Sequence, residues 1–216
     1  MKLCFLASGG GGNFKFFHLA QKYSIINNIE LYLVADRYCP SLEYARTHDI
    51  KNLIINYQQD NNEDLKKALN DINPDIIVSN WNKIIDKEIV SLYHNKIINL
   101  HYSILPLFPG LIGVAPIEAA YRNNCKYTGV TCHIVDEGVD TGEIIGQSMV
   151  KIDSNIDVII QKVFRNGCLV LLNSVQLLTG KTLIKYTVRE SHEFSPSLNF
   201  DDSDFSLGFW SDLSKI

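Results

Sequence analysis

The chain has 216 residues, of which 46% are hydrophobic and 20% are charged, and its formal net charge is −4. This length predicts one domain with its own hydrophobic core and a small C-terminal appendage. The mild negative charge and the lack of a basic cluster exclude nucleic acid as an expected main partner.

The cysteines and the hydropathy pattern bear on the compartment. Five cysteines are scattered along the chain with no Cys-x-x-Cys pair, which favours a reducing compartment and argues against a zinc site. No apolar run approaches the ~18–20 residues that a membrane span needs. The apolar start is shorter than the roughly 7–15 residues of a secretory signal core. We therefore expect a soluble cytoplasmic protein with no membrane partner and no metal.

Strand and helix patterns alternate over the first ~150 residues. Short, nearly all-apolar strands between helices predict an α/β fold with a Rossmann-like, mostly parallel sheet covered by helices on both faces. A short loop joins the last two strands, which predicts an antiparallel pair. The expected strands are 2–7, 29–36, 52–56, 75–80, 96–101, 129–136 and 143–152, and the expected helices are 13–23, 41–48, 61–72, 86–94, 115–123 and 155–178.

The C-terminal segment follows the long helix. We expect a main domain over residues 1–180, and a short extension over 181–216 with one strand and a polar, acidic tail. The apolar stretch 204–210 in this tail could pack on the domain or against a partner.

A glycine loop, "ASGGGGN", lies between the first strand and the first helix. Its backbone N–H groups can approach an anion, and the helix terminus adds a partial positive charge. The spacing fails the dinucleotide fingerprint because Phe14 stands at the sixth position, and no Gly-Lys-Ser/Thr follows. We favour a phosphate cradle over the alternative, a flexible tight turn.

Two polar side chains end the strand 96–101. Asn99 and His101 are separated by one residue, so they should project from the same face while Leu100 faces a core. A rigid turn with two prolines follows. A polar pair that only tethers a loop is the alternative reading.

A carboxylate comes from the glycine-flanked loop "EGVDTG", which holds Asp140. An aspartate in such a loop is often only a turn former. Together, however, an amide, an imidazole and a carboxylate suit acyl transfer without a covalent enzyme intermediate. Asp140 would favour imidazolium at His101. The sequence has no Gly-x-Ser-x-Gly motif that would supply a serine nucleophile. Cys132 is next to His133, but neighbouring residues of a strand face opposite ways, so the two should not form a nucleophile pair.

These residues resemble a known family. "NLHYSILPLFPG" followed by "TGVTCHIVDEGVDTGEIIGQ" resembles the folate-dependent formyltransferases, and most of all the glycinamide ribonucleotide transformylases, over residues 1–180. The resemblance implies the formyltransferase catalytic-domain fold and transfer of a formyl group from 10-formyltetrahydrofolate, the co-substrate, to a primary amine of a small molecule. It implies a catalytic set of Asn99, His101 and Asp140.

The resemblance also implies binding residues. The expected folate-binding residues are Asn82, Lys83, Ile84, Ile85, Glu137, Gly138 and Val139, and the expected substrate-phosphate residues are Gly10, Gly11, Gly12 and Asn13. For Ile84 and Ile85 an ordinary core position is the alternative.

The chain departs from the purine enzymes where the acceptor would bind. Gly12 replaces the usual threonine, "LIGVAP" resembles tRNA and sugar formyltransferases, and the ribose-side glutamate of the purine enzymes aligns with Gly167. A nucleotide-linked amino sugar therefore competes with glycinamide ribonucleotide as acceptor, whereas the missing basic RNA-binding domain makes tRNA improbable.

Three further possibilities stay open. A formyltetrahydrofolate hydrolase would use water as acceptor, although such enzymes usually carry an N-terminal regulatory domain, and here the first strand begins at Lys2. A non-catalytic folate- or phosphate-binding module of the same fold would not need all three polar groups. A homodimer is also possible.

Overall fold

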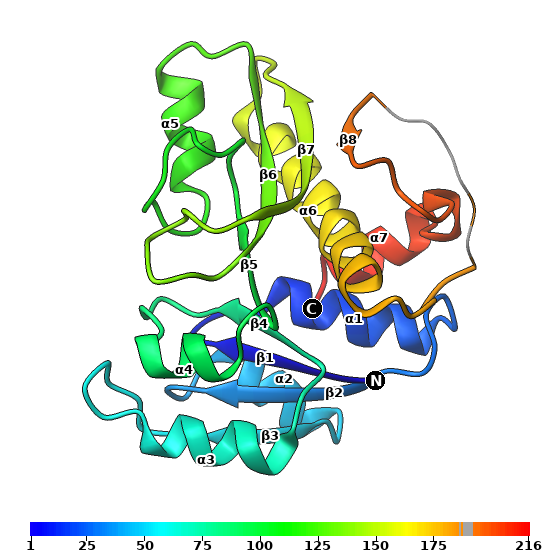
Figure 1. Cartoon of the computed structure of the whole chain (residues 1–216). Helices are drawn as coiled ribbons and strands as arrows, with labels where there is room; N and C mark the ends of the chain where they lie inside the picture. Colours follow the sequence, from blue (N-terminus) through cyan, green and yellow to red (C-terminus); the bar gives the residue numbers. More distant parts are fainter. Residues whose placement is uncertain (186, 188–191) are drawn as a thin grey trace. The chain divides into compact units, whose positions relative to one another are not determined.

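The computed structural model describes residues 1–185, 187 and 192–216. The described residues form two compact units, one of residues 1–97 and 203–216, and one of residues 98–202 (Figure 1). The first unit is an α/β structure with parallel strands and the second is built on antiparallel strands, which confirms the α/β fold class.

The first unit orders its strands β3-β2-β1-β4, all parallel. The edge strand β3 is mostly exposed, whereas β1 and β4 are apolar and mostly buried, as expected of strands covered by helices. Its elements are β1 (Lys2–Ala7), α1 (Gly12–Lys22), β2 (Glu30–Ala35), α2 (Pro40–Thr47), β3 (Lys51–Ile54), α3 (Glu63–Ile72), β4 (Ile76–Asn80), α4 (Lys87–Leu92) and the C-terminal α7 (Leu207–Leu213).

The second unit orders its strands β5-β6-β7-β8, each pair antiparallel, which confirms the predicted antiparallel pair β6–β7. Helix α6 packs along β6 and β7 and buries most of its C-terminal half. The elements are β5 (Ile97–His101), α5 (Ala115–Arg122), β6 (Tyr127–Ile134), β7 (Ile144–Lys151), α6 (Ile156–Thr179), β8 (Phe194–Ser195) and a 3₁₀ turn at Asp202–Asp204.

The expectation that no segment approaches the length and hydropathy of a membrane span is wrong for α6, which is long and apolar enough to cross a bilayer by length and composition alone. Much of it is buried inside the second unit, and a buried core helix passes the same test, so this feature is weak evidence for a membrane span.

The segment 181–216 contains the strand β8 and the helix α7, while residues 186 and 188–191 of the expected C-terminal extension lie outside the described part of the chain. The apolar stretch 204–210 packs on α1. Phe16 of α1 contacts the rings of Phe205, Phe209 and Trp210 at centroid distances of 5.3, 5.6 and 5.8 Å. This aromatic cluster joins the C-terminal segment to the first unit.

The start of α3 has no side-chain cap. Asn62 occupies the N-cap position of α3, but its side chain makes no capping hydrogen bond. Its amide nitrogen instead donates to Asp86 Oδ1 at 2.8 Å. Asp86, in turn, caps α4 by accepting from the Glu88 N–H, so Asn62 supports the next helix instead of its own.

Candidate active site

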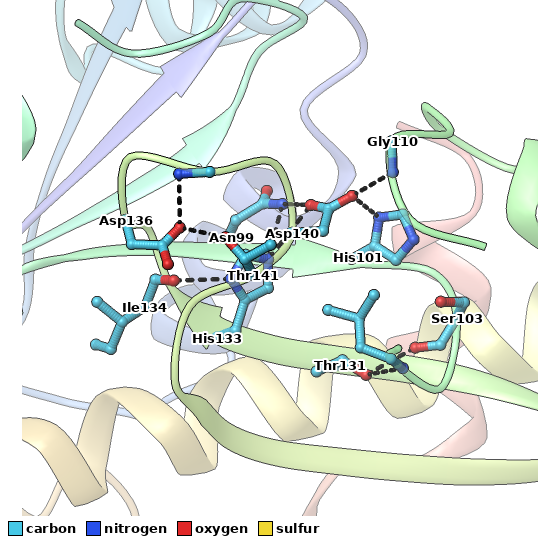
Figure 2. A network of polar contacts seen from close by, with 12 residues as sticks. Asn99, His101, Ser103, Gly110, Thr131, His133, Ile134, Asp136, Asp140 and Thr141 are labelled. Atoms are coloured by element: carbon cyan, nitrogen blue, oxygen red, sulfur yellow. Dashed lines mark hydrogen bonds and ion pairs between the residues drawn. The ribbon is translucent and has the colours of Figure 1, made fainter. Parts of the chain in front are cut away.

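Asn99 and His101 end the strand β5, and both reach the side chain of Asp140 (Figure 2). His101 Nδ1 lies 3.2 Å from Asp140 Oδ2, and Asn99 Nδ2 lies 3.5 Å from Asp140 Oδ1. Leu100 between them is buried. The expectation that the two polar side chains share one face is therefore confirmed, and the three groups named in the catalytic set lie together.

Asp140 is placed by a loop with unusual backbone geometry. It lies between β6 and β7, and its φ of 55° is in the left-handed region, which aspartate tolerates better than most residues. Its Oδ2 accepts a hydrogen bond of 2.7 Å from the Gly110 N–H. The carboxylate thus links the loop after β6 to the turn that follows His101.

The turn after His101 is anchored to the neighbouring strands. Thr131 of β6 donates from Oγ1 to the Ser103 carbonyl at 2.7 Å and accepts from the Leu105 N–H at 3.0 Å. Gln147 of β7 donates to Thr131 Oγ1 and to the Leu105 carbonyl, at 2.9 and 3.1 Å. The turn brings the Phe108 carbonyl to 2.9 Å from His101 Nε2. Each ring nitrogen of His101 therefore faces an acceptor.

The His101 side chain is 5% exposed, and its burial has the largest effect on its pKa. Burial lowers the pKa of His101 below its usual value, although the Asp140 carboxylate and the Phe108 carbonyl both raise it. The expectation that Asp140 favours imidazolium is confirmed, since the carboxylate raises the His101 pKa, but burial outweighs this effect. In the free protein at neutral pH the neutral ring predominates.

For the pKa of Asp140, hydrogen bonds and nearby charges outweigh the effect of burial. Burial alone would raise its pKa, but hydrogen bonds from His133 and the Gly110 N–H and the charges of the two histidines lower it below its usual value. Asp140 is therefore ionised at neutral pH. A carboxylate next to a neutral imidazole can orient the ring and accept or return a proton.

His133 is the residue of this cluster that sequence reasoning missed. It lies opposite Asn99 in the β5–β6 ladder and is buried. Its Nδ1 donates to the Ile134 carbonyl at 2.8 Å, and its Nε2 lies 3.4 Å from Asn99 Nδ2 and 3.5 Å from Asp140 Oδ1. A neutral His133 accepts from Asn99, and a protonated one donates to Asp140.

The pairing register, which the sequence does not give, is what brings His133 to this face. The sequence offered one signal for His133: side chains alternate between the two faces of a strand, so His133 faces away from the side of β6 that carries Cys132. Cys132 is buried, and burial raises the pKa of its thiol to about 12, so it is no nucleophile.

The glycine loop belongs to the first unit. Gly12 begins α1, and Gly11 occupies its N-cap with φ 64°. The Ser41 N–H donates to the Gly9 carbonyl at 3.0 Å, so the loop is held against the start of α2. Asn13 is buried. The left-handed Gly11 and the hydrogen bond from Ser41 give the loop a fixed shape. Phosphate binding by this loop stays a prediction, with Gly10, Gly11, Gly12 and Asn13 as the expected residues.

We expect Gly11→Ala to lower the free energy of unfolding by about 1–2 kcal/mol through its left-handed backbone alone. The added Cβ would also lie 2.5 Å from Ser41 Cβ, which increases the loss. Gly10→Ala is the matched control, because no described atom lies within 4 Å of a Cβ built there. Urea unfolding of the two variants tests this, and equal stability would contradict the tight fit at Gly11.

The expected folate residues divide between the two units. In the first unit, the Asn82 N–H donates to Ser8 Oγ at 3.2 Å, and Lys83 Nζ donates to the Tyr57 carbonyl at 3.1 Å. Ile84 is 57% exposed, whereas Ile85 is 6% exposed. Ile85 is therefore a core residue, and Ile84 has a side chain free to meet a ligand.

In the second unit, Glu137, Gly138 and Val139 are exposed in the loop that carries Asp140. Their role in folate binding also stays a prediction. Gly167 lies inside α6, where a Cβ would be 3.1 Å from Leu100 Cδ2 and 3.2 Å from Tyr102 Cε1. This position faces β5 at close range, so the helix packs there without room for a longer side chain.

The lowered pKa of His101 predicts how the unfolding free energy depends on pH. Because its pKa is lowered in the folded chain, the stability linked to this group is present above about pH 6.5, the usual unfolded value. That stability is lost as the pH falls through the lower folded value. We expect the drop in unfolding free energy from neutral to mildly acidic pH to be smaller in His101→Gln than in the parent.

Denaturant titrations at several pH values measure this difference. His94→Gln is the control, because it makes the same substitution at an exposed histidine outside this cluster. Identical pH dependence in all three proteins would mean that burial does not lower the pKa of His101.

An amide donor, a buried imidazole and an ionised carboxylate lie together near the end of β5, an arrangement that is typical of sites for acyl transfer. Comparison with known proteins narrows this class. The formyl transferase family model matches residues 1–163, and the chain belongs to this family. Members of the family use 10-formyltetrahydrofolate as formyl donor, which agrees with the co-substrate expected from the resemblance.

Individual relatives differ in their reactions. The chloroplastic phosphoribosylglycinamide formyltransferase of Arabidopsis thaliana is 31% identical over 164 residues, which cover 71% of this chain and 56% of that protein. A formyltetrahydrofolate deformylase of Haemophilus influenzae is 33% identical over 90 residues, which cover 41% of this chain and 31% of that protein. The chain thus spans about half the length of the first of these relatives and less of the second.

A solved structure supports the fold assignment. The phosphoribosylglycinamide formyltransferase of Bacillus halodurans matches with a TM-score of 0.70 and 28% identity, over 83% of this chain and 94% of that one. The similarity confirms a folate-dependent formyltransferase fold close to the glycinamide ribonucleotide enzymes.

Proposed function

We propose that the protein is an N-formyltransferase that moves a formyl group from 10-formyltetrahydrofolate to the primary amine of a phosphate-bearing small molecule. The observation that carries the proposal is the contact of His101 with Asp140 beside Asn99. Family membership supports formyl transfer, and the raised pKa of the buried Cys132 thiol, which keeps it from acting as a nucleophile, supports direct attack by the acceptor.

Asn99 suits the stabilisation of a developing negative charge. Its amide nitrogen is 3.4–3.5 Å from both His133 and Asp140, at the long end of hydrogen bonding. These weak bonds leave the N–H groups available to the formyl oxygen as the oxygen gains charge. His101 lies on the same strand face and would share that oxygen once it is protonated and its Nε2–H turns from the Phe108 carbonyl to the formyl group.

When bound, 10-formyltetrahydrofolate supplies the formyl carbon, which the unprotonated amine of the acceptor attacks. The amine nitrogen forms the new C–N bond while the bond to the folate nitrogen breaks. Asp140 orients His101 and carries the proton that the amine loses, which returns to the departing folate nitrogen. No group is oxidised or reduced in this exchange.

The acceptor is the finer part of the proposal. We infer glycinamide ribonucleotide or a nucleotide-linked amino sugar, with the phosphate held by the glycine loop. The similarity to phosphoribosylglycinamide formyltransferases supports the first, and the apolar "LIGVAP" segment 111–116 supports the second. The segment exposes the side chains of Leu111, Ile112 and Val114.

A formylation assay with mass detection tests the proposal. The protein is incubated with 10-formyltetrahydrofolate and either glycinamide ribonucleotide or a panel of nucleotide-linked amino sugars, and the expected result is a formylated amine. Rapid release of formate without any acceptor would instead identify a hydrolase, the reaction named for the deformylase relatives. Folate binding with no product in any arm would favour a non-catalytic module.

A further inference from the structure

The loop that carries Asp140 is closed by a side-chain contact of its own. Asp136 Oδ1 accepts two hydrogen bonds, one of 3.0 Å from the Gly138 N–H and one of 2.8 Å from Thr141 Oγ1 (Figure 2). The first bond forms an ordinary aspartate turn. The second reaches five residues along the chain, to the residue directly after Asp140. We call these two residues, Asp136 and Thr141, the loop clasp.

The loop is packed tightly around the clasp. A Cβ on Gly138 would lie 2.0 Å from Thr141 Oγ1, and a Cβ on Gly142 would lie 1.8 Å from the Ile134 carbonyl oxygen. Glycine is therefore required at both positions for the loop to close around the Thr141 hydroxyl. Such close packing on both sides fixes the path of the backbone through Asp140.

Asp140 needs this support because its backbone is left-handed, at φ 55°. A residue in that region is held there only when its surroundings determine it. With Thr141 anchored, the Asp140 carboxylate reaches the Gly110 N–H at 2.7 Å and His101 Nδ1 at 3.2 Å. A released loop would let the residue relax and the carboxylate move away from the ring.

We propose that Asp136 and Thr141 are positioning residues, which hold Asp140 against His101 through the backbone of the loop. The catalytic meaning of this contact rests on the proposed function, but the contact itself does not. Neither clasp residue need touch a substrate. The clasp acts on the reaction only by fixing where the Asp140 carboxylate lies.

The pKa of His101 depends on where the loop clasp holds the Asp140 carboxylate, so it measures whether the clasp is intact. Asp140 is the carboxylate that faces this ring, the Phe108 carbonyl faces its Nε2, and His133 adds a charge that lowers the His101 pKa. Burial also lowers that pKa, and Asp140 opposes both effects. If Asp140 moves away, the His101 pKa must fall.

The test compares Thr141→Val, which removes the hydroxyl and keeps the shape, with Thr141→Ser, which keeps the hydroxyl. The His101 pKa is measured by NMR titration of the ring in the protein without substrate. We expect Thr141→Val to lower this pKa, by less than Asp140→Asn does, and Thr141→Ser to leave it unchanged. An unchanged pKa in Thr141→Val would overturn the proposal.

A second pair tests the other half of the clasp and covers the case in which Thr141→Val does not fold. Asp136→Asn retains an acceptor oxygen and should keep the parent pKa at His101, whereas Asp136→Ala should lower it. The same pKa in both would contradict the proposal. Because the titration needs no acceptor, its outcome is independent of whether the proposed function is correct.

Kinetics add a second readout once an acceptor is identified. A misplacement of about 1 Å at a catalytic group can cost roughly 100-fold in rate. We expect Thr141→Val to lower kcat by roughly 10- to 100-fold with little change in KM, and Thr141→Ser to restore most of it. A rise in KM alone would mean that Thr141 binds substrate, and would overturn its role as a positioning residue.

Discussion

Asp140→Asn should lower kcat by roughly 100-fold or more, the range that general acid–base groups contribute. Asparagine has the same shape, and its Oδ1 can still accept from the Gly110 N–H, so the loop should keep its path. The variant loses the negative charge beside His101 and the site that carries the proton. Steady-state formylation of the accepted amine measures the loss.

The same variant should change the pH dependence. Asp140 raises the His101 pKa against the larger lowering by burial, so removing its charge should lower that pKa further. If imidazolium is the reactive form, the fall of kcat/KM with rising pH should begin at lower pH in Asp140→Asn. Asp71→Asn, on the exposed side of α3, is the control and should match the parent. Near-parent turnover in Asp140→Asn would remove Asp140 from the catalytic set.

His101→Ala should also lower kcat by roughly 100-fold or more, since it removes both the charge partner of the formyl oxygen and the group that Asp140 orients. The substitution leaves the Phe108 carbonyl and one oxygen of Asp140 without the ring that faces them. KM for the acceptor should change much less than kcat, because the effect is on charge that develops during the reaction.

Circular dichroism and thermal unfolding must accompany the kinetics of His101→Ala, because the ring is 5% exposed and its loss leaves a cavity. His94→Ala is the matched control, since this exposed histidine follows α4 and lies in the first unit. If a folded His101→Ala protein formylated its acceptor at the parent rate, the assigned role of the imidazole would be wrong.

Local sequence patterns predicted most of the helices and strands, and they predicted that Asn99 and His101 share one face of β5. The short apolar strands, the spacing of two in "NLH" and the short loop after β6 are each properties of a few neighbouring residues. They were enough to place Asn99 and His101 on one face of β5 and to anticipate that β6 and β7 are antiparallel. The juxtaposition of Asp140 and His101 was expected from the chemistry of the three polar groups, and the resemblance to known formyltransferases implied the same set.

Other features depend on residues far apart in the chain. His133 joins the cluster because of the β5–β6 register, and α7 forms because its aromatic face meets α1. The net direction of the His101 pKa depends on how deeply the ring is buried, which a motif cannot show. These are tertiary effects, so a reading of local sequence could not supply them.

The return of α7 to α1 has a consequence for how the chain folds. The first unit consists of residues 1–97 and 203–216, so its aromatic cluster stays incomplete until the last segment has been synthesised. On the ribosome, the face of α1 that bears Phe16 is exposed while more than a hundred residues emerge. Phe16 therefore lacks its aromatic partners from the C-terminal segment until residues 205–210 have been synthesised.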